Sequence, residues 1–95
     1  MINEKAMTMI NDIIVRNNIN ENSTIKAIDC CCENDDFCII HKNTKSSRNK
    51  FKYQVSHFSK NKYSGKYSPE YDEKFETLEL AVGSILGVYE IVEVI

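Results

Sequence analysis

The sequence predicts one small α+β domain, in which an antiparallel sheet of three or four strands carries an N-terminal and a C-terminal helix on one face. Three observations lead to this fold class. Residues 3–17 repeat apolar side chains at spacings of three and four, and so do residues from about 70 onwards. Strand-like segments cluster between these two patterns, which gives the order α-β-β-β-α. A length of 95 residues predicts a single domain spanning 1–95.

The first element is an amphipathic helix over residues 3–17. Asn3 is placed to cap its start, while Glu4 and Arg16 suit the two ends of the helix dipole. Its apolar stripe consists of Ile2, Ala6, Met9, Ile10 and Ile13. The polar residues Asn17, Asn18 and Asn20 end the helix.

Two strands follow, over residues 24–32 and 37–42, joined by a turn at 33–36. With Asn34 and Asp35 at the tip, Cys31 is expected opposite Cys38, and Cys32 opposite Phe37. One face then carries Ile28, Cys30, Cys32, Phe37 and Ile39, and the other carries Ala27, Asp29, Cys31, Cys38, Ile40 and Lys42. The first set is the more apolar, so we expect it to face the helices.

The third strand is predicted over residues 50–58, after a polar loop at 43–49. Phe51, Tyr53 and Val55 alternate with polar residues, which is typical of a half-buried strand. The alternation changes phase near His57 and Phe58, which indicates a bulge or the end of the strand. An exposed loop is expected over 59–69.

A second helix is expected to begin near Pro69 and Glu70, with Ser68 as its cap. Its core stripe would be Phe75, Leu78, Val82 and Ile85, and Gly87 is a suitable stop. Residues 88–95 are rich in β-branched side chains, which favours a final strand. Continuation of the helix through Tyr89 and Val92 is the alternative.

The four cysteines are Cys30, Cys31, Cys32 and Cys38. Three are consecutive, and neighbouring residues of a strand point to opposite faces, so we expect free thiols in a reducing compartment. Cys38 and His41 have ligand-like spacing, but they point to opposite faces of a regular strand. We therefore expect no metal and no cofactor. No catalytic motif is present, so the protein is not expected to be an enzyme.

Charge is segregated along the chain, and this is its most informative feature. Residues 1–36 hold seven acids and three bases, residues 37–69 eight bases and no acid, and residues 70–95 seven acids and one base. No apolar run approaches the length of a membrane span, and the first residues lack a signal-peptide pattern. A cytoplasmic protein with no membrane contact is expected.

Two classes of function remain. The basic segment 42–66 interleaves lysines with aromatic residues, as nucleic-acid-binding modules do. The α-β-β-β-α order also resembles the double-stranded-RNA-binding domain. That family has a basic cluster at the start of its second helix, where this chain has Glu70, Asp72 and Glu73. The opposite charge there makes nucleic acid the alternative partner.

The protein-binding class is the main prediction. In size, in its Asn-, Lys- and Ile-rich composition and in charge layout, the chain resembles immunity proteins of bacterial contact-dependent growth-inhibition systems. It is similar in the same respects to phage-encoded inhibitors such as anti-CRISPR proteins. The resemblance implies an antitoxin that binds and neutralises one cognate toxin and has no enzymatic activity. The partner would be basic, and the residues expected to bind it are Glu70, Asp72, Glu73, Glu76, Tyr67, Tyr71, Glu33, Asp35 and Asp36.

Overall fold

The computed structural model describes residues 4–29, 36–43 and 50–95. In chain order, its elements are α1 (Glu4–Arg16), β1 (Ile25–Asp29), β2 (Phe37–Lys42), β3 (Tyr53–Lys60), β4 (Tyr67–Phe75), α2 (Leu78–Ile85) and β5 (Tyr89–Val94). The strands form one antiparallel sheet in the order β4-β3-β2-β1-β5. The predicted α+β class is confirmed, but the sheet has five strands instead of three or four.

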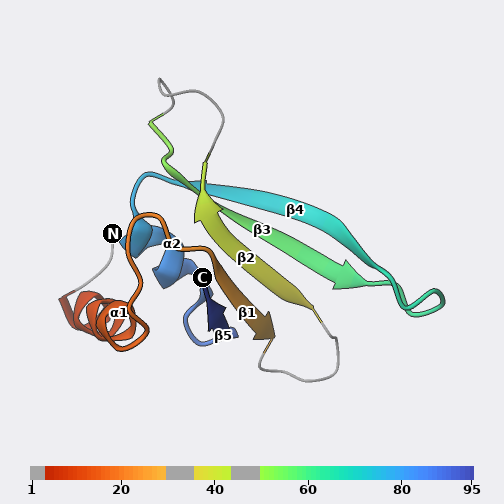
Figure 1. Ribbon diagram of the computed structural model, residues 1–95, viewed down its shortest axis with the longest axis horizontal. Helices are drawn as coiled ribbons and strands as arrows, with labels where there is room; N and C mark the ends of the chain where they lie inside the picture. The colour runs from red at the N-terminus through yellow and green to blue at the C-terminus, as the bar shows by residue number, and fades with distance from the viewer. Residues whose placement is uncertain (1–3, 30–35, 44–49) are drawn as a thin grey trace.

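The core lies between the two helices and one face of the sheet. α1 contributes Ile10, α2 contributes Ala81, Val82 and Ile85, and the sheet contributes Ile25, Ala27, Cys38, Ile40, Tyr53 and Val55. Figure 1 shows both helices near one end of the sheet, while the hairpin that joins β3 to β4 projects away from them. The helices therefore cover only part of the sheet, and β4 is exposed along nearly its whole length.

The first hairpin differs from its predicted register. Ala27 lies opposite Cys38 and Ile28 opposite Phe37, so Cys38 does not face Cys31, nor Phe37 Cys32. Residues 30–35, which include Cys30, Cys31 and Cys32, lie outside the described residues. The described part of β1 spans Ile25–Asp29, so the rest of the strand predicted to residue 32 is not tested. The predicted tip at Asn34 and Asp35 was the wrong assumption, because it requires a pairing that the described residues do not have.

The choice of the buried face was also wrong. Ala27, Cys38 and Ile40 are fully buried, whereas Ile28 is 41% exposed on the face away from the helices. For the described residues, the division into two faces was correct, because alternation preserves it under any even change in register. The strand pairs decide the face: Ile25, Ile40 and Val55 form one cross-strand row of aliphatic side chains through three strands, and that row meets the helices.

The segment from residue 67 to 75 is a strand and not the start of a helix. β4 pairs with β3 from Tyr67 to Phe75, and α2 begins only at Leu78. Thr77, not Ser68, caps α2, because its hydroxyl accepts the Leu80 N–H at 3.2 Å. Pairing with a neighbouring strand overrides the local helix-start signal, since Pro69 and the acids that follow it are also tolerated at a sheet edge.

The C-terminal part follows the strand prediction. α2 ends at Ile85, and Gly87 adopts a φ of 79°, a left-handed conformation that glycine adopts readily. The chain then forms β5, so a continuous helix to residue 95 is wrong. The helix stripe prediction holds for Leu78, Val82 and Ile85, which pack into or against the core, while Phe75 belongs to β4.

Candidate functional site

Most of the residues predicted to bind a partner lie together on one edge strand. We define the acidic strand as Tyr67, Glu70, Tyr71, Asp72, Glu73 and Glu76. The first five belong to β4, and Glu76 follows the last residue of that strand. β4 is the end strand of the sheet, and residues 67–74 are exposed on both of its faces. The structure thus brings these residues together on a strand instead of a helix.

A bulge in β4 sets the direction of the acidic side chains. His57 lies opposite Tyr71 and Phe58 opposite Pro69, which leaves Glu70 as an extra residue in β4. The register shift falls at the point where the sequence predicted a change of phase in β3. Because one residue is inserted, side chains before and after Glu70 exchange faces.

The two tyrosines of the acidic strand therefore point to opposite faces. Their spacing of four would place them on one face of a regular strand. Tyr67 meets the ring of Phe37 edge-on, with centroids 4.9 Å apart, on the face away from the helices. Tyr71 stacks on the ring of His57 at 4.3 Å on the helix side. The acidic strand consequently presents an aromatic ring on each face, and both tyrosines are about half exposed.

His57 holds the helix side of the acidic strand in place. Its Nε2 lies 2.8 Å from Oε1 of Glu73, and its Nδ1 lies 3.3 Å from the hydroxyl of Tyr89. A carboxylate only accepts, so the ring donates from Nε2 to Glu73, which leaves Nδ1 to contact the hydroxyl of Tyr89. Burial, together with nearby groups that include Cys38, raises the pKa of Tyr89 to about 12. This cluster joins β3, β4 and β5 and fixes the orientation of Glu73.

Cys38, a candidate nucleophile, lies beside this cluster. It is opposite His57 in the β2–β3 register and is fully buried. Burial, followed by the nearby Glu73 carboxylate, raises its pKa from 9.0 to about 12. Both ring nitrogens of His57 are engaged by Glu73 and Tyr89. The thiol is therefore neutral at ordinary pH and lacks the adjacent base that activates a nucleophile.

The hairpin acids do not join the acidic strand. Glu33 and Asp35 lie outside the described residues. Asp36 directly precedes β2, and its carbonyl accepts the Asp29 N–H at 3.0 Å. β2 is two strands from β4 in the sheet, a separation of about 10 Å. Asp36 thus belongs to a different part of the surface.

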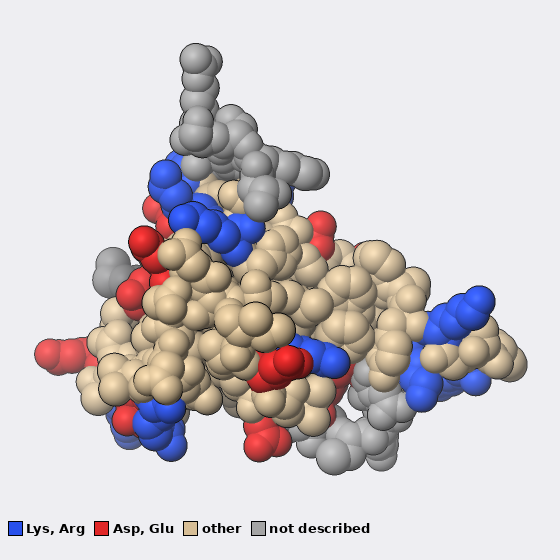
Figure 2. All heavy atoms as spheres, in the orientation of Figure 1, with Lys and Arg blue, Asp and Glu red and all other residues tan. Residues whose placement is uncertain are grey.

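The basic residues are divided between the two ends of the β3–β4 pair. Lys60, Lys62 and Lys66 surround the hairpin tip, where Tyr63 is fully exposed. Lys50 lies at the other end, 3.7 Å from Glu76 of the acidic strand. In Figure 2, the blue atoms of the projecting hairpin lie apart from the other blue atoms on this face of the molecule. Lys45 and Arg48 lie outside the described residues.

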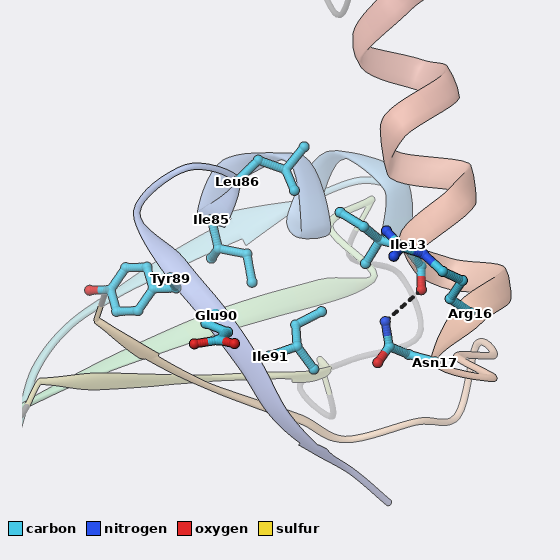
Figure 3. Close-up of a pocket in the computed structure, with 8 residues that line it drawn as sticks. All are labelled: Ile13, Arg16, Asn17, Ile85, Leu86, Tyr89, Glu90 and Ile91. Carbon is cyan, nitrogen blue, oxygen red and sulfur yellow. Dashed lines mark hydrogen bonds between the residues drawn. The ribbon is translucent and has the colours of Figure 1, made fainter. Parts of the chain in front are cut away.

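Sequence reasoning did not find a groove between α1, the end of α2 and β5. It has a volume of about 390 Å³ and is lined by Ile13, Arg16, Asn17, Ile85, Leu86, Tyr89, Glu90 and Ile91. Figure 3 shows the apolar side chains of α2 and β5 facing Ile13, with Arg16 and Asn17 at one end. Asn17 is held by a 2.8 Å bond from its Nδ2 to the Ile13 carbonyl. Only the packing of α1 on the other elements creates this hollow.

Comparison of the chain with protein-family models, with curated proteins and with solved structures found no match. Within the described residues, no three histidine, cysteine or acidic side chains come close enough to hold a metal ion. In that same part of the chain, neither helix is both long enough and apolar enough to cross a membrane. The acidic strand is thus the candidate functional surface of this fold.

Proposed function

We propose that this chain is a protein-binding inhibitor, of the immunity-protein kind, that neutralises a toxin by covering a basic surface of that protein. The observation that supports this is the acidic strand, where four carboxylates and two half-exposed tyrosines lie on an exposed sheet edge. Tyrosines are common energetic anchors at protein interfaces. The carboxylates supply charge that speeds encounter with a basic partner and selects it over others.

A toxin that cuts or modifies nucleic acid presents cations to phosphate groups. The acidic strand is attracted to the same cations as the phosphate groups are. When it binds there, it blocks access of the nucleic acid and thereby inhibits the toxin. Inhibition by coverage needs no catalytic group, and Cys38 and His57 lack the arrangement of an activated nucleophile. The cytoplasm is the compartment that we propose for this activity.

The test reverses charge on the acidic strand in a triple variant, Glu70→Lys, Asp72→Lys and Glu76→Lys. Glu73 is left in place because it holds His57. A partner captured from lysate at low and at physiological salt is identified, and its activity is measured with the chain added in stoichiometric amounts. We expect the triple variant to bind it at least about a hundredfold more weakly and to lose the inhibition.

The control has the same change in net charge at exposed acids away from β4: Glu4→Lys, Glu21→Lys and Glu90→Lys. Circular dichroism and thermal unfolding establish that both variants fold. Equal loss of binding in the two variants would show a general charge effect. Unchanged binding by a folded acidic-strand variant would remove this strand from the interface.

Nucleic-acid binding is the second candidate, and the hairpin tip is the observation in its favour. Lys60, Lys62 and Lys66 surround the exposed ring of Tyr63. We expect no submicromolar affinity for single-stranded or duplex RNA or DNA at about 150 mM salt, because the acidic strand begins directly beside this tip. Fluorescence anisotropy measures it. A submicromolar affinity that is lost in a Lys60→Glu, Lys62→Glu variant would replace the inhibitor proposal.

A further inference from the structure

The backbone of β4 has an outer edge whose hydrogen-bonding groups can be assigned from neighbouring bonds. The Asn43 N–H donates to the Lys52 carbonyl at 2.7 Å, so the backbone of Lys52 faces β2. Since these groups alternate along a strand, those of Tyr53, Val55 and His57 face β4. Their partners in β4 face inwards in return. The backbone groups of Asp72 and Lys74, which lie between those partners, therefore point out of the sheet.

The other half of the β4 edge is unsuited to pairing. The Asn61 N–H donates to the Lys66 carbonyl at 2.8 Å, so Tyr67 and Pro69 are the residues that face outwards there. Proline has no N–H to donate, and the bulge at Glu70 interrupts the strand next to it. A partner strand can therefore be continuous only along the half from Asp72 to Glu76.

A second copy of this chain fits this half less well than a basic strand does. Antiparallel pairing of identical edges must place one residue on the two-fold axis, opposite its own copy, because only outward-facing residues pair with one another. With Asp72, Glu73, Lys74 or Glu76 on the axis, like charges lie directly opposite one another, which is destabilising. With Phe75 on the axis, Lys74 lies opposite Glu76, but Asp72 and Glu73 have no basic partner. A basic strand neutralises these acids, so it suits the edge better than a second copy does.

We propose that the protein partner contributes an extended, basic segment that pairs through its main chain with residues 72–76 of β4 and adds a sixth strand to the sheet. This inference rests on the proposed function and states how the acidic strand binds. Main-chain bonds to Asp72 and Lys74 supply part of the affinity, as in other cases of strand addition. A basic side chain opposite Glu73 supplies the selectivity.

The test uses two synthetic peptides of equal charge with the intact chain. The first is acetyl-Lys-Val-Lys-Val-Lys-Val-Lys-amide, which can extend as a strand. The second has proline in place of valine and cannot donate at those positions. We expect the valine peptide to bind at least about tenfold more tightly, a difference of roughly 1.4 kcal/mol. Amide hydrogen exchange by NMR should show new protection at the N–H groups of Asp72 and Lys74.

Two variants separate main-chain pairing from charge. Lys74→Pro removes one outward N–H without touching the β3–β4 bonds, and Lys74→Ala removes the same side-chain charge but keeps the N–H. Among folded variants, we expect only the proline change to abolish the preference for the valine peptide. Equal binding of both peptides, or binding of neither, would overturn strand addition. The capture experiment with charge-reversed variants decides the proposed function separately.

A competing edge exists at β5, and the same exchange data distinguish it. Thr24 and Ile95 exchange backbone bonds at 2.9 Å, so the outward-facing amides of β5 are those of Tyr89, Ile91 and Val94. That edge carries exposed Val92 but no basic or proline residue. Peptide-induced protection at these three amides, with none at Asp72 and Lys74, would show that the peptide pairs with β5 and not with β4. That result would overturn the proposal.

Discussion

Ile40→Ala is expected to lower the free energy of unfolding by about 2–5 kcal/mol. Ile40 is fully buried in β2, the central strand of the sheet, between Ile25 and Val55. Its truncation removes apolar contact and leaves a cavity that close-packed neighbours on both sides cannot fill. Each kcal/mol corresponds to a shift in melting temperature of roughly 4–8 °C for a domain of this size. Urea and thermal unfolding measure the change.

The matched control is Ile28→Ala, on the neighbouring strand but on the face away from the helices. Ile28 is 41% exposed, so its truncation should cost about 1 kcal/mol or less. The pair of variants tests the buried face of the sheet directly. A larger loss at Ile28 than at Ile40 would contradict the observed packing and restore the face that the sequence favoured.

Alkaline pH is expected to destabilise the protein through Cys38. Burial raises the pKa of its thiol from 9.0 to about 12 in the folded state. The thiol is neutral when protonated, so between these values the unfolded chain releases a proton that the folded chain retains. Stability therefore falls as pH rises above about 9, by up to ~1.4 kcal/mol per pH unit. By pH 11 the loss from this group is roughly 3 kcal/mol.

Urea unfolding at pH 8, 9, 10 and 11 measures this slope for the natural chain and for Cys38→Ala. The variant is expected to be less stable near neutral pH, because it loses a buried side chain, but to have the flatter profile above pH 9. The difference between the two profiles isolates Cys38 from the other thiols and from Tyr89. Parallel profiles would show that Cys38 ionises no differently in the folded and unfolded states.

The local patterns of the sequence were sufficient to predict the elements in which the spacing of apolar residues matches the side that is buried. The stripe in residues 3–17 predicted α1, and the β-branched run at 88–95 predicted β5. The change of phase near His57 predicted a bulge or the end of the third strand, but β3 continues regularly to Lys60, and the inserted residue is Glu70 in the neighbouring strand β4. For α1 and β5, the signal lay within the segment itself.

The acidic strand shows where local patterns fail. Ser68, Pro69 and Glu70 form a good helix start, and the apolar residue Phe75 is spaced from Leu78 as on a helix. No alternation marks β4, because both of its faces are exposed and selection for a buried side is absent. Only β3, which supplies the hydrogen bonds, makes this segment a strand. The same residues remain candidates for binding, but their side chains point in the directions set by a strand and not by a helix.

The sequence by itself determined the α+β class, the separation of charge, the two faces of the first hairpin and the acidic residues of the candidate surface. The tertiary structure decided which face is buried, since that depends on a row of side chains from three strands. It also decided that β4 is an edge and that His57 joins Glu73 to Tyr89 across the sheet. Charge and periodicity are properties of neighbouring residues, whereas a sheet edge and a buried cluster exist only once distant segments pair.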